Sequence, residues 1–212
     1  MGSADQQPGI DRLKREKTLW AMGFQRIAGV DEAGVGPLAG PVVAAAVIFR
    51  QGEYLPDVND SKKLTPARRE KLAIGIREAS LAWSVAMVHP EEIDRLNIYH
   101  ASLEAMRRAV VGLKETPDQV LVDARTIPGI EISQEGIIKG DASCHIIGAA
   151  SILAKTARDQ LMAEMDIEYP GYGFAGHKGY PTEAHRDAIR KQGPCPIHRK
   201  SFNLLPERRL FE

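Results

Sequence analysis

The 212-residue chain carries 28 Lys plus Arg and 28 Asp plus Glu, so its formal net charge is zero. This balance excludes a globally basic nucleic-acid binder, although it leaves open an enzyme that combines local basic patches with an acidic site. Two cysteines are too few for a secreted disulfide framework, and the longest apolar run, Pro41 to Phe49, is far shorter than the roughly 20 residues of a membrane helix. We therefore expect a soluble, cytoplasmic protein with no membrane partner, built as one large domain.

Hydrophobic periodicity and capping residues predict the elements. A strand over 26–30 ends at Asp31 and Glu32, and a glycine-rich turn joins it to an apolar run over 42–49. That run fits a buried strand, although its three consecutive alanines leave a helix open. Early strands followed by helix–strand units predict a mixed sheet with helices on its faces. The other predicted elements are helices over 11–22, 66–80, from 90 onward, 101–113, 141–165 and 182–191, and strands over 81–89, 119–123 and 136–139.

Two acidic residues, Asp31 and Asp123, each follow a short apolar strand. Ligands of open α/β sheets bind outside the strand ends, and carboxylates gathered there repel one another unless a hard cation such as Mg²⁺ binds their oxygens. We interpret both, together with Glu32, as candidate metal ligands, and a capping or turn role for each stays open. Adjacent strand residues point to opposite faces, so Glu32 can join Asp31 in one site only if it lies past the strand end.

The segment 34–39 matches G-x-G-x-x-A, the dinucleotide-binding fingerprint. That fingerprint must open a helix, whereas Pro37 and Pro41 crowd this segment and a strand-like run follows it. Two carboxylates directly before the turn would also repel a pyrophosphate. We therefore favour another use of these glycines, the close approach of backbone N–H groups and metals to a nucleic-acid strand.

A series of motifs, which together span about residues 27–202, resembles the type 2 ribonucleases H (ribonuclease HII). The longest is GVDEAGVGPLAGPVV over 29–43. The motifs that follow it in the family order are DSKKL over 60–64, Val122-Asp123, KGD over 139–141, AASILAK over 149–155 with Arg158 and Asp159, HKGYPT over 177–182 and PIHR over 196–199.

The resemblance implies an α/β, ribonuclease H-like fold, with a mixed five-stranded sheet flanked by helices. Residues 1–22 would be an N-terminal tail and short helix, and 23–212 the catalytic domain. It implies a metal-dependent endonuclease that cuts on the 5′ side of a ribonucleotide in RNA–DNA hybrids or in ribonucleotide-containing duplex DNA, leaving 5′-phosphate and 3′-hydroxyl ends. The carboxylates that match the metal-binding, catalytic set are Asp31, Glu32, Asp123 and Asp141, which would hold two Mn²⁺ or Mg²⁺ ions. We expect a monomer.

The resemblance also implies substrate contacts. Tyr180 matches the tyrosine that packs at the ribonucleotide–deoxyribonucleotide junction, and a half-buried core position is its structural alternative. Backbone groups of Gly34, Val35 and Gly36 would contact the 2′-hydroxyl, which separates RNA from DNA. The candidate phosphate contacts, for each of which a solvated surface position stays open, are Lys62, Lys63, Lys178, His198 and Arg199.

Two positions depart from the family pattern. Val35 stands where the family usually has Arg, and the loss of one charged hydrogen bond lowers affinity or rate by about 10- to 100-fold. Ala124 stands where glycine is usual after Asp123, so its Cβ crowds that carboxylate or demands a different turn. These departures motivate a second hypothesis, a non-catalytic or weakly active hybrid-binding protein.

Asp159 is the other acid that could compete with Asp141 for the metal site. It lies 18 residues further along the predicted helix, which is about 27 Å on a straight helix. Both cannot reach one pair of ions unless that helix is broken. The motif match favours Asp141, so we interpret Asp159 as structural, paired with Arg158 or a neighbour.

Two other patterns are weak. Cys195-x-x-His198 has a zinc-like spacing, but His198 belongs to a matched motif. Ser151 and Lys155 lie four residues apart, as a Ser-Lys nucleophile pair could, but Ser151 lies within an apolar helix pattern.

Overall fold

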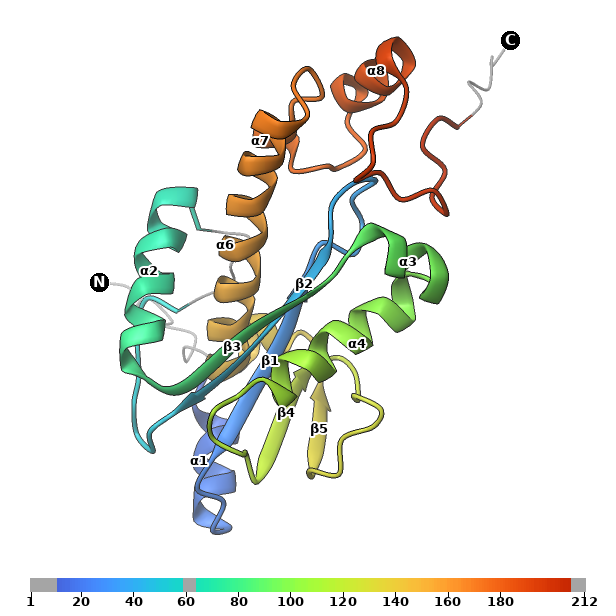
Figure 1. The fold of residues 1–212 in the computed structure, drawn as a ribbon. Helices are drawn as coiled ribbons and strands as arrows, with labels where there is room; N and C mark the ends of the chain where they lie inside the picture. The colour runs from blue at the N-terminus through green and yellow to red at the C-terminus, as the bar shows by residue number, and fades with distance from the viewer. Residues whose placement is uncertain (1–10, 59–63, 207–212) are drawn as a thin grey trace, which may run out of the picture.

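A five-stranded sheet in the order β3-β2-β1-β4-β5 forms the centre of the computed structural model, which describes residues 11–58 and 64–206 (Figure 1). β2 is antiparallel to β1 and β3, whereas β4 is parallel to β1 and β5. The strands are β1 (Ile27–Ala33), β2 (Val42–Phe49), β3 (Ser80–Val88), β4 (Gln119–Asp123) and β5 (Gln134–Ile137). The predicted mixed five-stranded sheet is therefore confirmed.

Helices cover both faces of this sheet (Figure 1). α4 packs on one face and α6 on the other, and each lies over its own layer of buried apolar side chains. Within the described ranges, no helix has the length and apolar content needed to cross a bilayer. The helices are α1 (Lys14–Ala21), α2 (Pro66–Ala79), α3 (Pro90–Leu96), α4 (Ile98–Val111), α5 (Gly140–Ser143), α6 (His145–Glu168), α7 (Phe174–His177) and α8 (Glu183–Gln192).

The alanine-rich run over 42–49 is a strand that is buried along its whole length. Ala44 and Ala46 belong to the α4 layer, whereas Ala45 and Val47 belong to the α6 layer. A strand covered on both faces needs no polar alternation. This is why the sequence pattern alone left a helix open here.

The long helix predicted over 141–165 is broken into α5 and α6 at Cys144. This residue has extended backbone angles (φ −121°, ψ 126°), so the helical hydrogen-bond ladder stops there. The first turn of α6 is held by the buried carboxylate of Glu16 in α1, whose Oε1 accepts a hydrogen bond from the Ile146 amide at 3.0 Å. Burial raises the pKa of Glu16. The break separates the Asp141 segment from the axis of α6.

β1 and α6 approach each other closely at Gly29. A Cβ at this position would collide with the backbone carbonyl of Ile146, so glycine is required for this packing. The short distance packs β1 directly against the first turn of α6.

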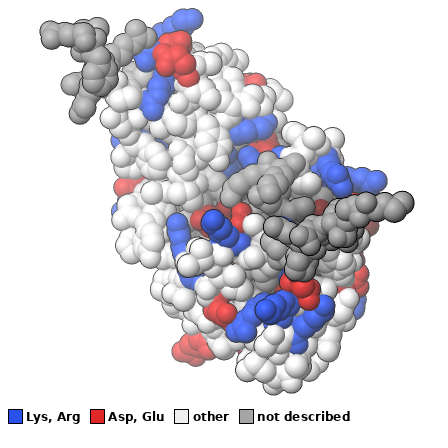
Figure 2. Space-filling view, turned by 180° about the vertical axis from the view of Figure 1, so that it is seen from behind, with Lys and Arg blue, Asp and Glu red and all other residues white. Residues whose placement is uncertain are grey.

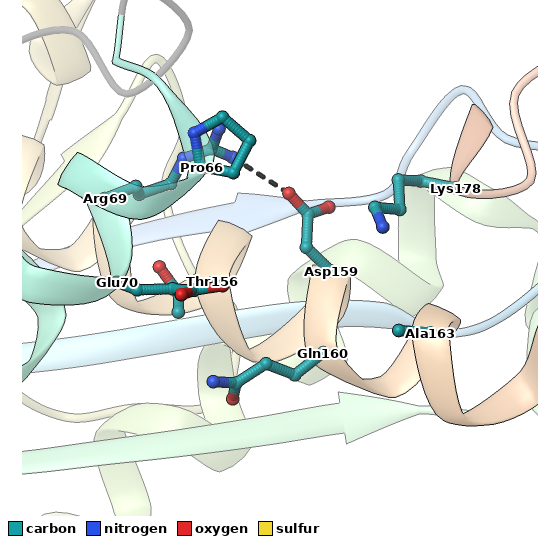
Figure 3. Close-up of a pocket in the computed structure, with 8 residues that line it drawn as sticks. All are labelled: Pro66, Arg69, Glu70, Thr156, Asp159, Gln160, Ala163 and Lys178. Atoms are coloured by element: carbon teal, nitrogen blue, oxygen red, sulfur yellow. Dashed lines mark hydrogen bonds and ion pairs between the residues drawn. The ribbon is translucent and has the colours of Figure 1, made fainter. Parts of the chain in front are cut away.

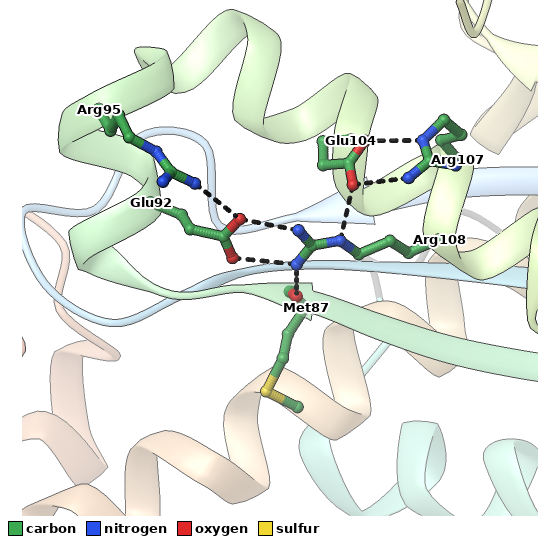
Figure 4. A network of polar contacts seen from close by, with 6 residues as sticks. All are labelled: Met87, Glu92, Arg95, Glu104, Arg107 and Arg108. Atoms are coloured by element: carbon green, nitrogen blue, oxygen red, sulfur yellow. Dashed lines mark hydrogen bonds and ion pairs between the residues drawn. The ribbon is translucent and has the colours of Figure 1, made fainter. Parts of the chain in front are cut away.

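An ion-pair network ties α3 to α4 and to β3 (Figure 4). The Arg108 guanidinium donates to Glu92 at 2.7 and 3.0 Å, to Glu104 at 2.8 Å and to the Met87 carbonyl at 3.3 Å. Hydrogen bonds from Arg107 and Arg108 lower the pKa of Glu104 to about 2. The network thereby holds α3 and α4 against each other and against β3.

Candidate active site

Asp31 and Glu32 lie within β1, because that strand continues to Ala33. Glu32 is in register with Ala44 of β2, so it does not lie past the strand end, yet its charge interacts with those of Asp31 and Asp123. The strand-end condition for a shared site is therefore too strict. The two side chains point to opposite faces, as strand alternation requires. Asp31 faces α6 and accepts hydrogen bonds from the side chain of Ser151 and, at 2.7 Å, from the Glu32 amide.

Asp123 and Asp141 approach the same end of the sheet from the neighbouring strand and from α5. Asp123 is the last residue of β4, which is parallel to β1. Its Oδ1 accepts a hydrogen bond from the Gly140 amide at 2.7 Å. Asp141 follows Gly140 in the first turn of α5, and only 7% of its surface is exposed. The parallel strand pair and the break before α6 thus bring both segments together.

The carboxylates at this end of the sheet disfavour one another's charge. Burial raises the pKa of Asp31 well above its usual range, and the negative charges of Glu32 and Asp123 raise it further. Burial and Asp123 also raise the pKa of Glu32, against the opposing effect of Arg125, whose guanidinium lies 3.9 Å from the Glu32 carboxylate. A bound cation would relieve this repulsion.

The donor set suits a hard divalent cation, since the side chains at the site offer carboxylate oxygens and share excess negative charge. Two of the oxygens now accept backbone hydrogen bonds, from Glu32 and from Gly140. Within the residues that the structure describes, no three His, Cys, Asp or Glu side chains are arranged to hold an ion as they stand. The fit therefore rests on the chemistry and charge of the donors.

Arg199 is buried, against the surface position expected of a phosphate contact. Its guanidinium is fully enclosed and donates to the backbone carbonyls of Gly40 at 2.9 Å, Val35 at 3.0 Å and Gly34 at 2.6 Å. In a trans peptide the C=O and the following N–H point in opposite directions. The amides of Val35 and Gly36 therefore face away from Arg199.

Arg158 supports the same segment from α6. This buried guanidinium donates to the carbonyls of Pro41 at 3.0 Å, Ala39 at 3.1 Å and Lys178 at 3.0 Å. Sequence reasoning missed this role. The signal in the sequence was a charged arginine within a helix pattern that is otherwise mainly apolar.

His198 is also buried, against the surface position expected of it. Only 1% of this residue is exposed, and its Nε2 lies 3.1 Å from Nε2 of His185. Its other ring nitrogen accepts a hydrogen bond from the Cys195 amide at 3.0 Å. The PIHR motif over 196–199 thus belongs to the interior of the protein.

The remaining predicted substrate residues lie at or near the surface. Tyr180 is 41% exposed, and a Cβ built on exposed Gly36 would lie 3.7 Å from its ring, so this side chain stands beside the glycine-rich segment. The side chain of Val35 is partly buried and packs against the α4 layer. Lys62 and Lys63 lie outside the described residues.

Lys178 lines a cavity of about 170 Å³ between α2 and α6, opposite Arg69 (Figure 3). Asp159 lies in this cavity, paired with Arg69 at 2.9 Å and with Lys155 at 2.7 Å. The structural role predicted for Asp159 is confirmed, with these partners in place of Arg158.

Ala124 follows Asp123 in a left-handed conformation, with φ of +55°. This conformation favours glycine, so Ala124 adopts it against the preference of its Cβ. Ala124 is exposed, and its amide donates to the Ile137 carbonyl at 2.9 Å.

Charged side chains of both signs lie close together on one face of the protein. On the face shown in Figure 2, basic and acidic residues alternate among uncharged ones. This face therefore carries basic and acidic residues beside one another.

The ribonuclease HII family model matches residues 28–205. A ribonuclease HII of Myxococcus xanthus is 58% identical over 196 residues, covering 92% of this chain and 67% of the relative. A ribonuclease HII of Moorella thermoacetica is 55% identical over 201 residues, covering 94% and 98%.

Solved structures agree on the fold. The ribonuclease H2 of Pyrococcus horikoshii superposes with a TM-score of 0.73 at 29% identity, covering 84% of this chain and 94% of that one. Bst-RNase HIII in complex with Mn²⁺ superposes with a TM-score of 0.58 at 18% identity, covering 91% and 68%, and is similar in fold alone.

The fold is therefore that of the ribonuclease H-like nucleases. The chain belongs to the ribonuclease HII family and is an endonuclease, a hydrolase of phosphodiester bonds.

Replacing Ala124 by glycine should stabilise the protein, because glycine adopts the observed turn without a Cβ penalty. We expect Ala124→Gly to raise the free energy of unfolding by about 1 kcal/mol, measured by urea denaturation. Ala67→Gly, at an exposed position in the first turn of α2, should not stabilise. Equal effects of the two changes would contradict the strain at Ala124.

Arg199→Leu should lower the free energy of unfolding by about 3 kcal/mol, because three buried carbonyls lose their donor. Lys200→Leu, which changes the exposed neighbouring side chain, should leave stability nearly unchanged. If Arg199 instead contacted phosphate, Arg199→Leu would leave stability intact and reduce the salt dependence of substrate binding.

Proposed function

We propose that this endonuclease is metal-dependent, and that it cuts the RNA strand of RNA–DNA hybrids and duplex DNA at embedded ribonucleotides. It would cut on the 5′ side of the ribonucleotide and leave 5′-phosphate and 3′-hydroxyl ends, as a monomer in the cytoplasm. The observation that carries this proposal is the mutual charge repulsion of Asp31, Glu32 and Asp123 at the ends of two adjacent parallel strands. Family membership supports the reaction class.

Asp31, Glu32, Asp123 and Asp141 would hold the divalent ions, Mn²⁺ or Mg²⁺. When bound, two such ions lower the pKa of an attacking water and stabilise the leaving 3′-oxygen. The chain's own groups orient the carboxylates for this task, through Ser151 at Asp31 and the Gly140 amide at Asp123.

The glycine-rich segment and Tyr180 would bind the substrate beside these carboxylates. The amides of Val35 and Gly36 face away from Arg199, so they are oriented to donate to a 2′-hydroxyl or phosphate oxygen. The exposed Tyr180 ring stands next to Gly36 and could lie against a sugar. Lys178, Lys62 and Lys63 are the candidate phosphate contacts that remain after the burial of His198 and Arg199.

Asp31→Asn should abolish cleavage of a duplex with one embedded ribonucleotide, and EDTA should abolish cleavage by the unchanged protein. Because the substitution removes a buried, repelled charge, the metal-free variant should melt higher by about 2–4 °C. Mn²⁺ should raise the melting temperature of the unchanged protein more than that of the variant.

Glu164→Gln is the matched control for Asp31→Asn, since this carboxylate is exposed on α6. It should retain cleavage and the Mn²⁺-dependent rise in melting temperature. Full cleavage by Asp31→Asn would remove Asp31 from the site.

Val35→Arg should raise kcat/KM on the same duplex by about 10- to 100-fold, because it adds a charged hydrogen-bond donor beside the cut. Val35→Met is the control, because it lengthens the side chain without adding charge. An equal gain from both variants, or no gain from arginine, would contradict the role assigned to the charge. Binding of the duplex by the unchanged protein without metal-dependent cutting would favour the hybrid-binding alternative.

A further inference from the structure

Three histidines cluster beneath Tyr180, between α7, α8 and the segment before Arg199. His185 and His198 are almost fully buried, and His177 stacks on His185 with ring centroids 4.4 Å apart. Their hydrogen-bond partners are backbone groups, the Cys195 thiol and one another.

The hydrogen bonds determine where the protons lie. His185 Nδ1 is 2.9 Å from the carbonyl oxygen of Tyr180, which can only accept, so Nδ1 must carry the proton. In the neutral ring, His185 Nε2 is then an acceptor, and the His198 Nε2 that faces it at 3.1 Å must donate. His198 Nδ1 is consequently an acceptor, which agrees with the Cys195 N–H that points to it at 3.0 Å. The Cys195 carbonyl oxygen lies 3.2 Å from the same nitrogen, but it already accepts a hydrogen bond from the His198 backbone amide at 3.0 Å.

Both rings are neutral in this arrangement. Burial lowers the pKa of His185 to about 4, and the positive charges that His177 and His198 would carry also disfavour its protonation. Burial likewise lowers the pKa of His198. A second proton on His185 would set two donors against each other unless the His198 tautomer reversed.

The chain of bonds ends on the backbone that carries Tyr180. His177 contacts the same stretch of backbone, because its Nδ1 accepts a hydrogen bond from the Gly179 amide at 3.1 Å. The Gly179 carbonyl in turn accepts a hydrogen bond from the Leu38 amide at 2.8 Å. The position of Tyr180 relative to the glycine-rich segment is thus set by histidine hydrogen bonds.

We propose that His185 and His198 are positioning residues that hold Tyr180 against the ribonucleotide. Both rings are neutral and form a relay of hydrogen bonds that all point the same way. The Cys195 N–H donates to His198, His198 donates to His185, and His185 donates to the Tyr180 carbonyl. The effect on cleavage rests on the proposed function, whereas the tautomers do not.

NMR of the full chain with ¹⁵N-labelled histidine tests the relay directly. We expect the Nδ1–H tautomer for His185 and the Nε2–H tautomer for His198 at neutral pH. The opposite tautomer or a cationic ring at His185 would overturn the proposal, whether or not the protein cleaves its substrate. Failure of the unchanged protein to cleave would instead count against the proposed function alone.

Two substitutions of His198 separate the relay from simple packing. His198→Gln keeps an N–H near the position of Nε2, whereas His198→Leu fills the space without a donor. We expect His198→Leu to lower kcat/KM on a duplex with one ribonucleotide by about tenfold, mainly through KM, and His198→Gln to restore most of it. His89→Leu, at an exposed histidine, should have no effect.

The double variant with Tyr180→Ala shows whether His198 acts through Tyr180. If it does, His198→Leu should cause little further loss of kcat/KM in the Tyr180→Ala background. Independent, multiplicative losses would overturn the proposal, as would equal losses in His198→Leu and His198→Gln. If His198→Leu does not fold, the tautomer measurement still decides.

Discussion

Negative charge buried at the ends of β1 and β4 is the constraint on which the arrangement of the site depends. Asp31 and Glu32 lie on opposite faces of one strand, and Asp123 ends its parallel neighbour, so the three charges repel one another through a poorly solvated region. The fold holds them there through long-range packing. Gly29 lets α6 approach β1, and the break at Cys144 turns α5 toward Asp123. Such a group of carboxylates is unfavourable without a cation, which is the observation that supports the proposed metal dependence.

Buried positive and neutral groups support the surface beside this acidic group. Arg158 and Arg199 direct their N–H groups at backbone carbonyls of the glycine-rich segment, which orients its amides in the opposite direction. His185 and His198 support the neighbouring Tyr180 backbone. The zero net charge is therefore the sum of an acidic site and basic groups, some of which are buried and bind backbone carbonyls.

Much of the fold follows from local patterns. The Thr65 cap, the apolar run of β4 and the periodicity of α6 each predict their element, because capping and burial act within a few residues. The acidic group was also predictable, since Asp31 and Asp123 both follow short apolar strands. The errors concern Arg199 and His198, which were expected at the surface. A buried arginine and an exposed one have the same local sequence pattern, because burial depends on what folds over the residue.

Local sequence patterns were enough to predict most of the elements and the residues that supply negative charge, although they left the run over 42–49 open between strand and helix. Long-range packing explains why β1 extends past Glu32, why the long helix breaks at Cys144, and why Arg199 binds carbonyls. These features rest on contacts between distant segments, such as Glu16 with the Ile146 amide and Arg199 with the Gly34 carbonyl. These hydrogen bonds join residues more than a hundred positions apart in the sequence, so they form only when the core is assembled. Local sequence propensity therefore does not predict them.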